Sequence, residues 1–337
     1  MVFRGQTLGK YRILEPLGSG GFGTVYLAED TWIDKRVALK VPHRQNLDFG
    51  ELLKEPRLLA SLGHPNIVQV ITAEKQDNVF FIVMEYVPGE TLETLIAHKG
   101  ALDLMQALDY TAQIVNAVEH AHTHNVLHRD LRPANVFVTD KGLLKVGDFG
   151  TSRVLEIAAH GTTVIGSPPY MAPEQFEGRA VFASDLYSIG VTMYQMLTGY
   201  LPYETPAPSD LGRLKRGELV TPLRVRNANI PKSVDDIVSR ALSPDVGTRY
   251  QRAEELLNDL IAIRRDLVRK PPPAVPTTPT PAGTTAPARP APLPRTSSTP
   301  TPTRLRPRET PAARFCWQCR KPLPARGSRC PFCGESQ

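Results

Sequence analysis

A glycine-rich turn near the start of the chain constrains the fold most, because a strand and not a helix follows it. Residues 11–40 contain YRILEPLGSGGFGTVYLAED and RVALKV, which are rich in β-branched and aromatic residues and predict strand, turn, strand, turn, strand. The turn reads G-x-G-x-x-G-x-V from Gly18 to Val25. The same glycine spacing marks a dinucleotide-binding fold when it leads from a strand into a helix. Here it predicts a β-hairpin whose backbone N–H groups fold over phosphates.

A lysine follows this hairpin at the end of the next strand, and a candidate partner follows the lysine. Lys40 closes the sequence VALK, about fifteen residues after the turn, where an ammonium would meet phosphates. The segment ELLKEPRLLASLGHPNIV predicts a helix and contains Glu55, the predicted partner of Lys40. Pro56 removes a hydrogen bond within that helix and tends to kink it, so Glu51 is a second, weaker candidate.

The remaining pattern predicts a mostly β N-terminal part followed by a mostly helical part, an α+β organisation. Residues 79–95 predict a strand pair and a link, and residues 103–124 show helical periodicity. Short apolar strands flank a turn in residues 135–146. After some twenty residues with little periodicity, residues 185–265 are helical in pattern.

The loop HRDLRPAN, residues 128–135, lies between two apolar segments and carries one carboxylate, two guanidiniums and one amide. Such a loop can both accept a proton and hold charge. A second acidic motif, Asp148-Phe149-Gly150, follows the next strand.

Taken together, these ordered motifs resemble the eukaryotic-type protein kinase family, and most closely its bacterial serine/threonine kinases. The resemblance covers residues 11–265 and implies a two-lobed kinase fold with a β-rich N-lobe and a helical C-lobe. It implies transfer of the ATP γ-phosphoryl group to Ser or Thr hydroxyls of protein substrates, in signalling.

The resemblance also assigns catalytic roles to individual residues. Asp130 matches the catalytic base, and Asn135 and Asp148 match the residues that hold Mg²⁺ (or Mn²⁺). Lys40 with Glu55 would fix the α- and β-phosphates of ATP. Arg132 would contact the transferring phosphate.

The expected nucleotide site combines the glycine-rich loop, apolar walls and a hinge. Met84 would guard the back of the pocket, and the backbone of residues 85–87 would bind the adenine edge. The predicted nucleotide-binding residues are Leu17, Gly18, Ser19, Gly20, Gly21, Phe22, Gly23, Thr24, Val25, Ala38, Lys40, Glu85, Val87 and Phe137.

Three further matches look structural, and two positions depart from the family pattern. Glu174 and Arg249 match a buried ion pair, and Asp185 matches the acid that braces the catalytic loop. Arg132 replaces the usual Lys and brings a bulkier fork. Ser167 replaces the usual Thr and keeps the hydroxyl.

Thr163 falls at the family's main activation-loop phosphosite, and Thr162 precedes it. We expect autophosphorylation there, with Arg129 receiving the phosphate through charge-assisted hydrogen bonds. The alternative is an exposed, unmodified threonine.

The net charge of +6 belongs to the tail, since residues 271–337 carry ten Lys and Arg against two acids, and residues 1–270 carry thirty against thirty-two. Residues 271–314 are dominated by Pro, Thr, Ala and Arg and predict a disordered linker with polyproline II character. Basic residues scattered through such a segment favour solvation over a nucleic-acid site.

Residues 315–337 contain two C-x-x-C pairs, formed by Cys316, Cys319, Cys330 and Cys333. Four thiolates at this spacing resemble a zinc ribbon and predict a closed structural Zn²⁺ site, with a protein partner as one use for it. A redox dithiol is the alternative. The apolar runs are too short for a membrane span and the N-terminus lacks a signal peptide's apolar core, so we expect a cytoplasmic protein.

Two other functions and one other metal site compete with this interpretation. A pseudokinase scaffold would only bind partners, but Lys40, Asp130, Asn135 and Asp148 are all present. A nucleic-acid-binding regulator would need aromatic residues interleaved with the basic ones of the tail. A metal site at His120, His122 and His124 competes with the favourable placement of histidines at a helix C-terminus, which we prefer.

Overall fold

The structure is a computed structural model that describes residues 3–20, 23–43, 45, 49–149, 167–269, 314–315 and 322–323. The side chains of residues 49, 51, 54, 55, 208, 314, 315, 322 and 323 lie outside that description. The chain divides into two units, Met1–Ala274 and Val275–Gln337, which are treated separately.

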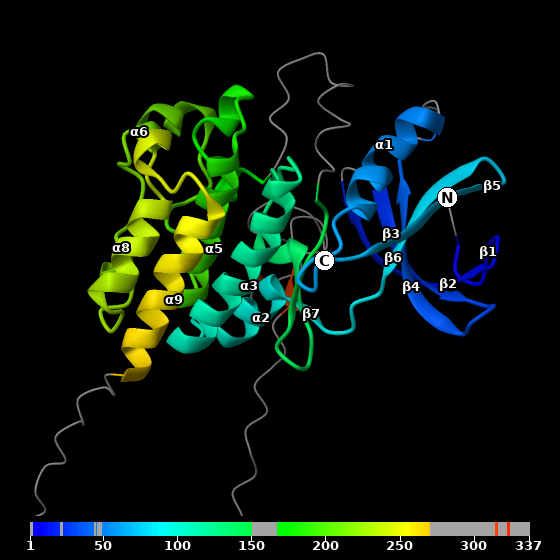
Figure 1. Ribbon diagram of the computed structural model, residues 1–337, viewed down its shortest axis with the longest axis horizontal. Coiled ribbons are helices and arrows are strands. Elements are labelled where there is room, and N and C mark those ends of the chain that lie inside the picture. Colours follow the sequence, from blue (N-terminus) through cyan, green and yellow to red (C-terminus); the bar gives the residue numbers. More distant parts are fainter. Residues whose placement is uncertain are drawn as a thin grey trace, which may run out of the picture. The chain divides into compact units, whose positions relative to one another are not determined.

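An antiparallel sheet forms the first lobe of the larger unit, in the strand order β1-β2-β3-β4-β6-β5. Figure 1 shows it in blue and cyan, with helix α1 beside it. Its strands are β1 (Thr7–Leu8), β2 (Tyr11–Gly20), β3 (Gly23–Asp30), β4 (Lys35–Pro42), β5 (Val70–Gln76) and β6 (Val79–Glu85). The strand-turn-strand pattern predicted for residues 11–40 is confirmed, with the third strand extending two residues past Lys40.

The period-two alternation of β4 explains how this sheet supports a site. Val37 and Leu39 are buried in the apolar core of the lobe, on one face. Ala38 and Lys40 therefore face the other way, and both line cavities of the molecule. Lys40 pairs with Val25 on β3, so the hairpin after the glycine-rich turn places the two side chains on neighbouring strands.

Helix α1 (Phe49–Ala60) packs on β5 and continues past Pro56. Leu52 is buried with Val70, Phe80 and Ile82 of the sheet, and Leu59 packs against the same cluster. The predicted apolar face is confirmed at Leu58, Leu59 and Leu62, although Leu62 lies just beyond the end of the helix.

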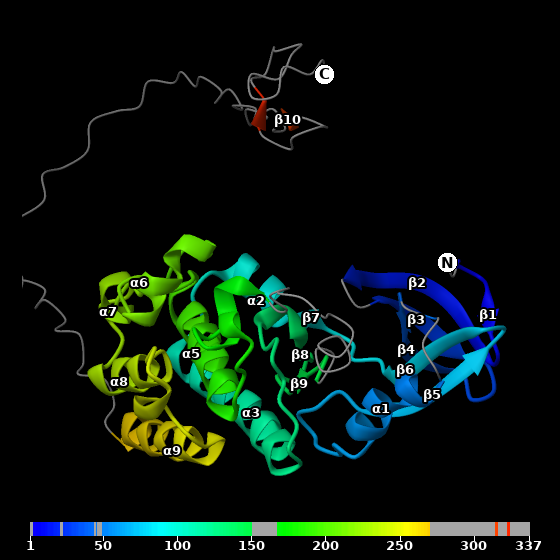
Figure 2. The same ribbon diagram turned by 90° about the horizontal axis from the view of Figure 1, so that it is seen from above.

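The second lobe is mainly helical and carries a small sheet of order β7-β8-β9 on the side that faces the first lobe (Figure 2). The strands are β7 (Glu90–Thr91), β8 (Val136–Val138) and β9 (Leu144–Val146). The α-helices are α2 (Leu92–Lys99), α3 (Leu104–Thr123), α5 (Phe182–Thr198), α6 (Leu211–Lys215), α7 (Leu223–Arg226), α8 (Lys232–Ala241) and α9 (Ala253–Arg269). Single 3-10 turns lie at Pro133–Asn135, Pro168–Tyr170, Gln175–Glu177, Pro208–Asp210 and Val246–Thr248.

Helix α5 is the centre of this lobe, because nearly every residue from Ala183 to Thr198 is buried. It packs against α3 and α8, and α3 also packs against α9. A helix that is apolar on all sides is stable only when other elements surround it. The lobe is thereby built around α5, which carries Asp185 in its first turn.

Two predicted boundaries need comment. The helix predicted at residues 103–124 is confirmed, with the Asp103 side chain accepting the N–H groups of Met105 and Gln106 as N-cap. The strand pair assigned to residues 79–95 was placed too late, because its first strand is Val70–Gln76. That strand is largely half-buried or exposed, so its sequence VITAEKQ shows only a weak apolar pattern.

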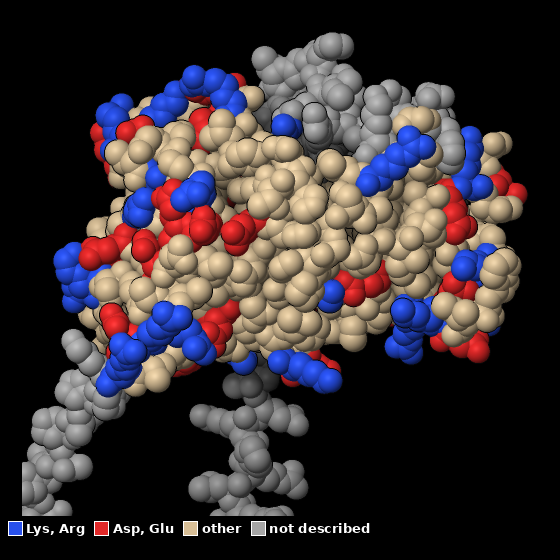
Figure 3. All heavy atoms as spheres, in the orientation of Figure 1, with Lys and Arg blue, Asp and Glu red and all other residues tan. Residues whose placement is uncertain are grey.

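Charges of both signs lie side by side over the helical lobe on the face shown in Figure 3, in keeping with the near balance of residues 1–270. Among the helices of the described residues, none combines the length and apolar character needed to cross a bilayer. In the smaller unit, β10 (Arg314–Phe315) pairs antiparallel with β11 (Pro322–Leu323).

Candidate active site

A cleft of about 320 Å³ opens between the first sheet and the strands β8 and β9 of the helical lobe. Its volume falls in the range of small-molecule sites, and its walls are mainly apolar with a few polar groups. The lining residues are Leu17, Gly18, Val25, Ala38, Val68, Met84, Glu85, Tyr86, Val87, Gly89, Thr91, Ala134, Phe137, Gly147 and Asp148. The predicted walls, hinge and guard residue thus meet in one cavity.

The hinge segment is fastened from both sides. The Glu85 N–H donates to the Gln69 carbonyl over 2.9 Å, and the Gln69 N–H donates to Glu85 Oε1 over 2.8 Å. Lys145 Nζ, from β9 of the other lobe, donates to the same oxygen over 2.6 Å. The Glu85 carboxylate therefore links the two lobes beside the cleft.

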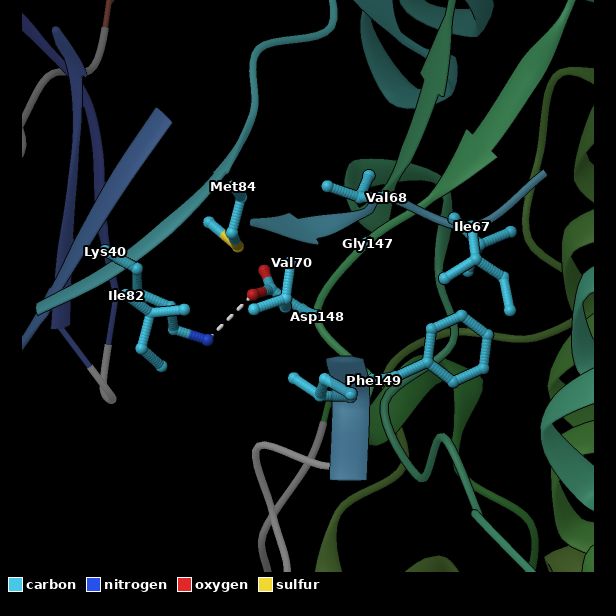
Figure 4. A pocket seen from close by; sticks show the side chains of 11 residues that line it. Lys40, Ile67, Val68, Val70, Ile82, Met84, Gly147, Asp148 and Phe149 are labelled. Atoms are coloured by element: carbon cyan, nitrogen blue, oxygen red, sulfur yellow. Dashed lines mark hydrogen bonds and ion pairs between the residues drawn. The ribbon is translucent and has the colours of Figure 1, made fainter. Parts of the chain in front are cut away.

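At the inner end of the cleft, Lys40 pairs with Asp148 over 2.8 Å, as the dashed line in Figure 4 shows. The Lys40 side chain is 9% exposed, whereas that of Asp148 is 41% exposed because it faces the opening. Burial raises the pKa of Asp148, but the Lys40 charge and hydrogen bond outweigh it and hold the pKa below its usual value. Asp148 is therefore an ionised, accessible carboxylate.

The backbone around Asp148 is held in an unusual conformation. Asp148 has φ 57°, a left-handed value that is uncommon for residues other than glycine. A Cβ on the preceding Gly147 would lie 3.0 Å from the Phe137 ring, so a side chain would crowd that position. The Gly147 N–H donates to the Asn135 carbonyl over 2.8 Å, which ties Asp148 to the catalytic loop.

Within that loop, the Asp130 carboxylate is oriented at both oxygens. Oδ1 accepts the Ser167 backbone N–H over 3.0 Å, and Oδ2 lies 3.3 Å from Asn135 Nδ2. Asn135 Nδ2 also donates to the Asp130 carbonyl over 2.8 Å. Both hydrogen bonds of the Asn135 side chain thus go from its amide nitrogen to Asp130. Its amide oxygen can therefore bind a ligand.

Asp185 braces the same loop from α5, as predicted. Its carboxylate accepts the N–H of His128 over 2.9 Å and the N–H of Arg129 over 2.8 Å. Arg129 has φ 67°, and these bonds stabilise that strained conformation. Burial raises the pKa of Asp185, but the hydrogen bond with His122 and nearby imidazole charge lower it below its usual value.

The two residues that depart from the family pattern contact each other. Arg132 Nη1 donates to Ser167 Oγ over 2.7 Å, and Nη2 lies 3.6 Å from Glu93 Oε1 in the first turn of α2. Ser167 also donates its backbone N–H to Asp130, so Ser167 connects the Arg132 guanidinium to the predicted base.

The predicted pair of Glu174 and Arg249 is confirmed, with Nη1 to Oε1 at 2.7 Å and side-chain exposures of 10% and 0%. Burial raises the pKa of Glu174, and the hydrogen bonds from Arg249 and Ser184 reverse this and leave it below its usual value.

The histidines near the end of α3 form a ring stack that the sequence did not reveal. His120 stacks on His64, with centroids 5.1 Å apart, and His124 lies 4.5 Å from His120. Burial and then neighbouring charge lower the pKa of both His64 and His120, which favours neutral rings. His122 instead faces Asp185 over 2.8 Å. The part of the chain that the structure describes contains no group of three or more side chains arranged to hold a metal ion.

Several predicted residues lie outside the described residues: Gly21, Phe22, Thr162, Thr163, Cys316, Cys319, Cys330 and Cys333, together with the side chains of Glu51 and Glu55. Sequence reasoning missed Val68, Gly147 and Thr91 in the cleft and Glu93 beside Arg132. Gly147 directly precedes the Asp-Phe-Gly motif, which was a usable signal. The other three carry no local pattern.

With this geometry established, comparison with known proteins decides the family. The pattern of the protein kinase domain matches residues 11–261. The chain belongs to the protein kinase family. The two-lobed fold, the cleft between the lobes and the loop at Asp130 are the kinase features of this chain.

Three similar curated proteins come from bacteria. A probable serine/threonine-protein kinase of Clostridium perfringens is 36% identical over 270 residues, covering 78% of this chain and 39% of the relative. The serine/threonine-protein kinase PrkC of Bacillus subtilis is 36% identical over 260 residues, covering 75% and 40%. PknB of Mycolicibacterium smegmatis is 33% identical over 267 residues, covering 75% and 43%. The chain thus spans about two fifths of the length of these relatives.

Proposed function

We propose that this chain is a serine/threonine protein kinase that transfers the γ-phosphoryl group of ATP to protein hydroxyls. The observation that carries the proposal is the link between its two charged centres. The Lys40–Asp148 pair lies at the inner end of the cleft, and the Gly147 N–H bond to Asn135 joins it to the loop that orients Asp130. The names of the curated relatives support the same activity.

The cleft suits a nucleotide. Its apolar walls at Leu17, Val25, Ala38 and Phe137 fit a flat ring, and the backbone of residues 85–87 offers hydrogen bonds to the ring edge. Lys40 and the glycine-rich loop of residues 18–25 supply the cation and backbone N–H groups that phosphates require.

The donor set at the inner end fits Mg²⁺ or Mn²⁺. Asp148 is ionised and accessible, and Asn135 keeps an amide oxygen, so both offer the hard oxygen ligands that these ions prefer. The ion would offset negative charge on the phosphates. Lys40 holds Asp148 in place for that purpose.

Asp130 is the proposed base for the acceptor hydroxyl. Each of its oxygens already accepts one hydrogen bond, so the carboxylate is fixed in orientation. The substrate hydroxyl that receives the phosphoryl group can donate to a remaining lone pair. Since phosphoryl transfer depends mainly on positioning and charge, this arrangement is sufficient for the reaction.

The test is phosphate transfer by the purified chain with ATP and Mg²⁺, to itself and to a mixture of Ser- and Thr-containing peptides. We expect Asp130→Asn to reduce transfer by about 10²-fold or more while nucleotide binding persists. The exposed Asp140, changed to Asn, is the matched control and should retain full transfer. Equal incorporation in wild type and Asp130→Asn would overturn the proposal and favour a pseudokinase scaffold.

We further propose autophosphorylation at Thr163, with Thr162 as a second site, and Arg129 as the receiving cation. Both threonines lie outside the described residues, so the proposal rests on their place in the sequence. Mass spectrometry of the active chain would find neither residue modified if the proposal is wrong.

For residues 315–337 we propose a zinc ribbon that docks a protein partner. The antiparallel pairing of Arg314–Phe315 with Pro322–Leu323, on either side of Cys316 and Cys319 in the sequence, supports this proposal, and the cysteines themselves lie outside the described residues. Four thiolates would close a tetrahedral Zn²⁺ site. Metal analysis of protein purified without chelator should find zinc, and loss of zinc in a Cys330→Ser variant would locate it.

The proposed plan is thus a kinase domain at residues 11–265, a linker at 271–314 and the ribbon at 315–337. A cytoplasmic location remains a prediction from the sequence.

A further inference from the structure

Arg132, one of the two arginines of the loop 128–135, is held by two other residues. Arg132 Nη1 donates to Ser167 Oγ over 2.7 Å, and Nη2 lies 3.6 Å from Glu93 Oε1. Arg132 Nε is buried and meets no hydrogen-bond acceptor among the residues that the structure describes. The direction of the guanidinium therefore depends on its two terminal nitrogens.

Glu93 is well placed to set that direction because α2 is itself fixed. The helix is capped by Thr91, whose hydroxyl accepts the Thr94 N–H over 3.1 Å, and it packs beside the turn Pro133–Asn135. Leu92 and Leu95 on either side of Glu93 are buried. Glu93 is 50% exposed, so its carboxylate lies at the open edge of the loop and not in the core.

The charges of Glu93 and Arg132 both act on the Tyr170 hydroxyl, in opposite directions. Its hydroxyl donates to Gln195 over 2.7 Å, and burial followed by the Glu93 charge raises its pKa to about 12, with Arg132 acting in the opposite direction. Tyr170 thus stays neutral and hydrogen-bonded to α5.

We propose that Glu93 is a positioning residue for Arg132, which it holds toward Ser167 and hence toward Asp130. This inference rests on the proposed kinase activity. A guanidinium presents donors in a fixed fork and can bridge two acceptors, whereas a lysine ammonium is a single point on a flexible stem. Arg132, Ser167 and Glu93 therefore act as one unit, in which Glu93 supplies the second anchor that an arginine needs.

The alternative is that Glu93 only stabilises helix α2, because an acidic residue near a helix N-terminus is favourable whichever residue occupies position 132. The two explanations differ in one respect. If Glu93 positions Arg132, its effect depends on the guanidinium at position 132. If Glu93 only stabilises the end of α2, its effect is the same with either residue there.

The experiment is a double-mutant cycle of Glu93→Gln and Arg132→Lys, with kcat and the KM for ATP measured on a Ser-containing peptide. We expect Glu93→Gln to lower kcat by about threefold to fivefold in the wild-type background, with KM for ATP nearly unchanged, because one partly exposed ion pair is lost. In the Arg132→Lys background the same change should alter kcat by less than about twofold.

Glu90→Gln is the matched control, since Glu90 has a similar side-chain exposure of 42%, carries the same charge and lies 3.8 Å from His98. It should leave kcat unchanged. An unchanged or increased kcat in Glu93→Gln, or an equal loss in both backgrounds, would overturn the inference. If wild type transfers no phosphate, the proposed function itself fails, and the two failures are thereby distinguished.

Discussion

Two ion pairs in this kinase domain have the same chemistry and opposite environments. Arg249 and Glu174 are 0% and 10% exposed, whereas Lys40 and Asp148 are 9% and 41% exposed. Arg249 also donates to the carbonyls of Ala183 and Ser243, at 2.9 Å each. In the first pair the donors of the cation are used within the protein, and in the second the anion is left open to the cleft.

The difference shows where each pair contributes. A buried charge is tolerated only when it is paired and hydrogen-bonded, so Arg249 holds its surroundings in one arrangement. A carboxylate that faces a cleft keeps lone pairs for a ligand and does less for stability. We therefore expect one pair to control folding and the other to control phosphate transfer.

Removing Arg249 should have the largest effect. Arg249→Ala leaves the Glu174 carboxylate buried without its partner, and we expect the free energy of unfolding to fall by about 3–5 kcal/mol. Urea unfolding followed by circular dichroism measures it. Arg252→Ala, at a side chain 70% exposed, is the control and should change stability by less than about 1 kcal/mol. A similar small loss in both variants would break the comparison.

Lys40→Met should separate activity from stability. Loss of the ammonium removes both a phosphate-binding cation and the group that positions Asp148, so we expect transfer to fall by about 10²-fold or more. Because the pair is open on one side, the free energy of unfolding should change by no more than about 1 kcal/mol. Initial-rate assays measure the transfer, and unfolding of the same preparation measures the stability. A variant that transfers phosphate normally would contradict the role proposed for Lys40.

The smallest expected effect is a difference in acid sensitivity. The folded pKa of Glu174 lies below its usual value of about 4.5, so its ionisation stabilises the fold above that value. This stability is lost as pH falls through the folded pKa, by at most about 1.4 kcal/mol per pH unit for one proton. Unfolding between pH 6 and pH 3 should therefore be less pH-dependent in Glu174→Gln, and an identical slope in both proteins would contradict the prediction.

Local patterns in the sequence predicted the parts of the molecule that are defined locally. The β-branched and aromatic residues before Lys40 and the periodicity of residues 103–124 gave elements that the structure confirms. The strand Val70–Gln76 was missed because it is mostly half-buried or exposed, and so lacks a clear apolar period.

Contacts between distant residues were predicted only where the family resemblance supplied them. The pairing of Glu174 with Arg249 came from that source. Nothing in the sequence places Glu93 beside Arg132 or His64 on His120, because each contact joins a helix to a distant loop and does not follow any local period. The departures at Arg132 and Ser167 were visible separately, and the structure was needed to bring them together.

The bonds from His128 and Arg129 to Asp185 have a consequence for hydrogen exchange. These two amide hydrogens are held by a carboxylate on α5, a helix that is buried along almost its whole length. They can exchange with solvent only when that carboxylate withdraws, so their protection should match that of the α5 core and exceed what is usual for a loop. The loop that carries the proposed base thus shares the opening free energy of the helical core, and a molecule whose helical lobe has opened loses the arrangement of this loop at the same moment.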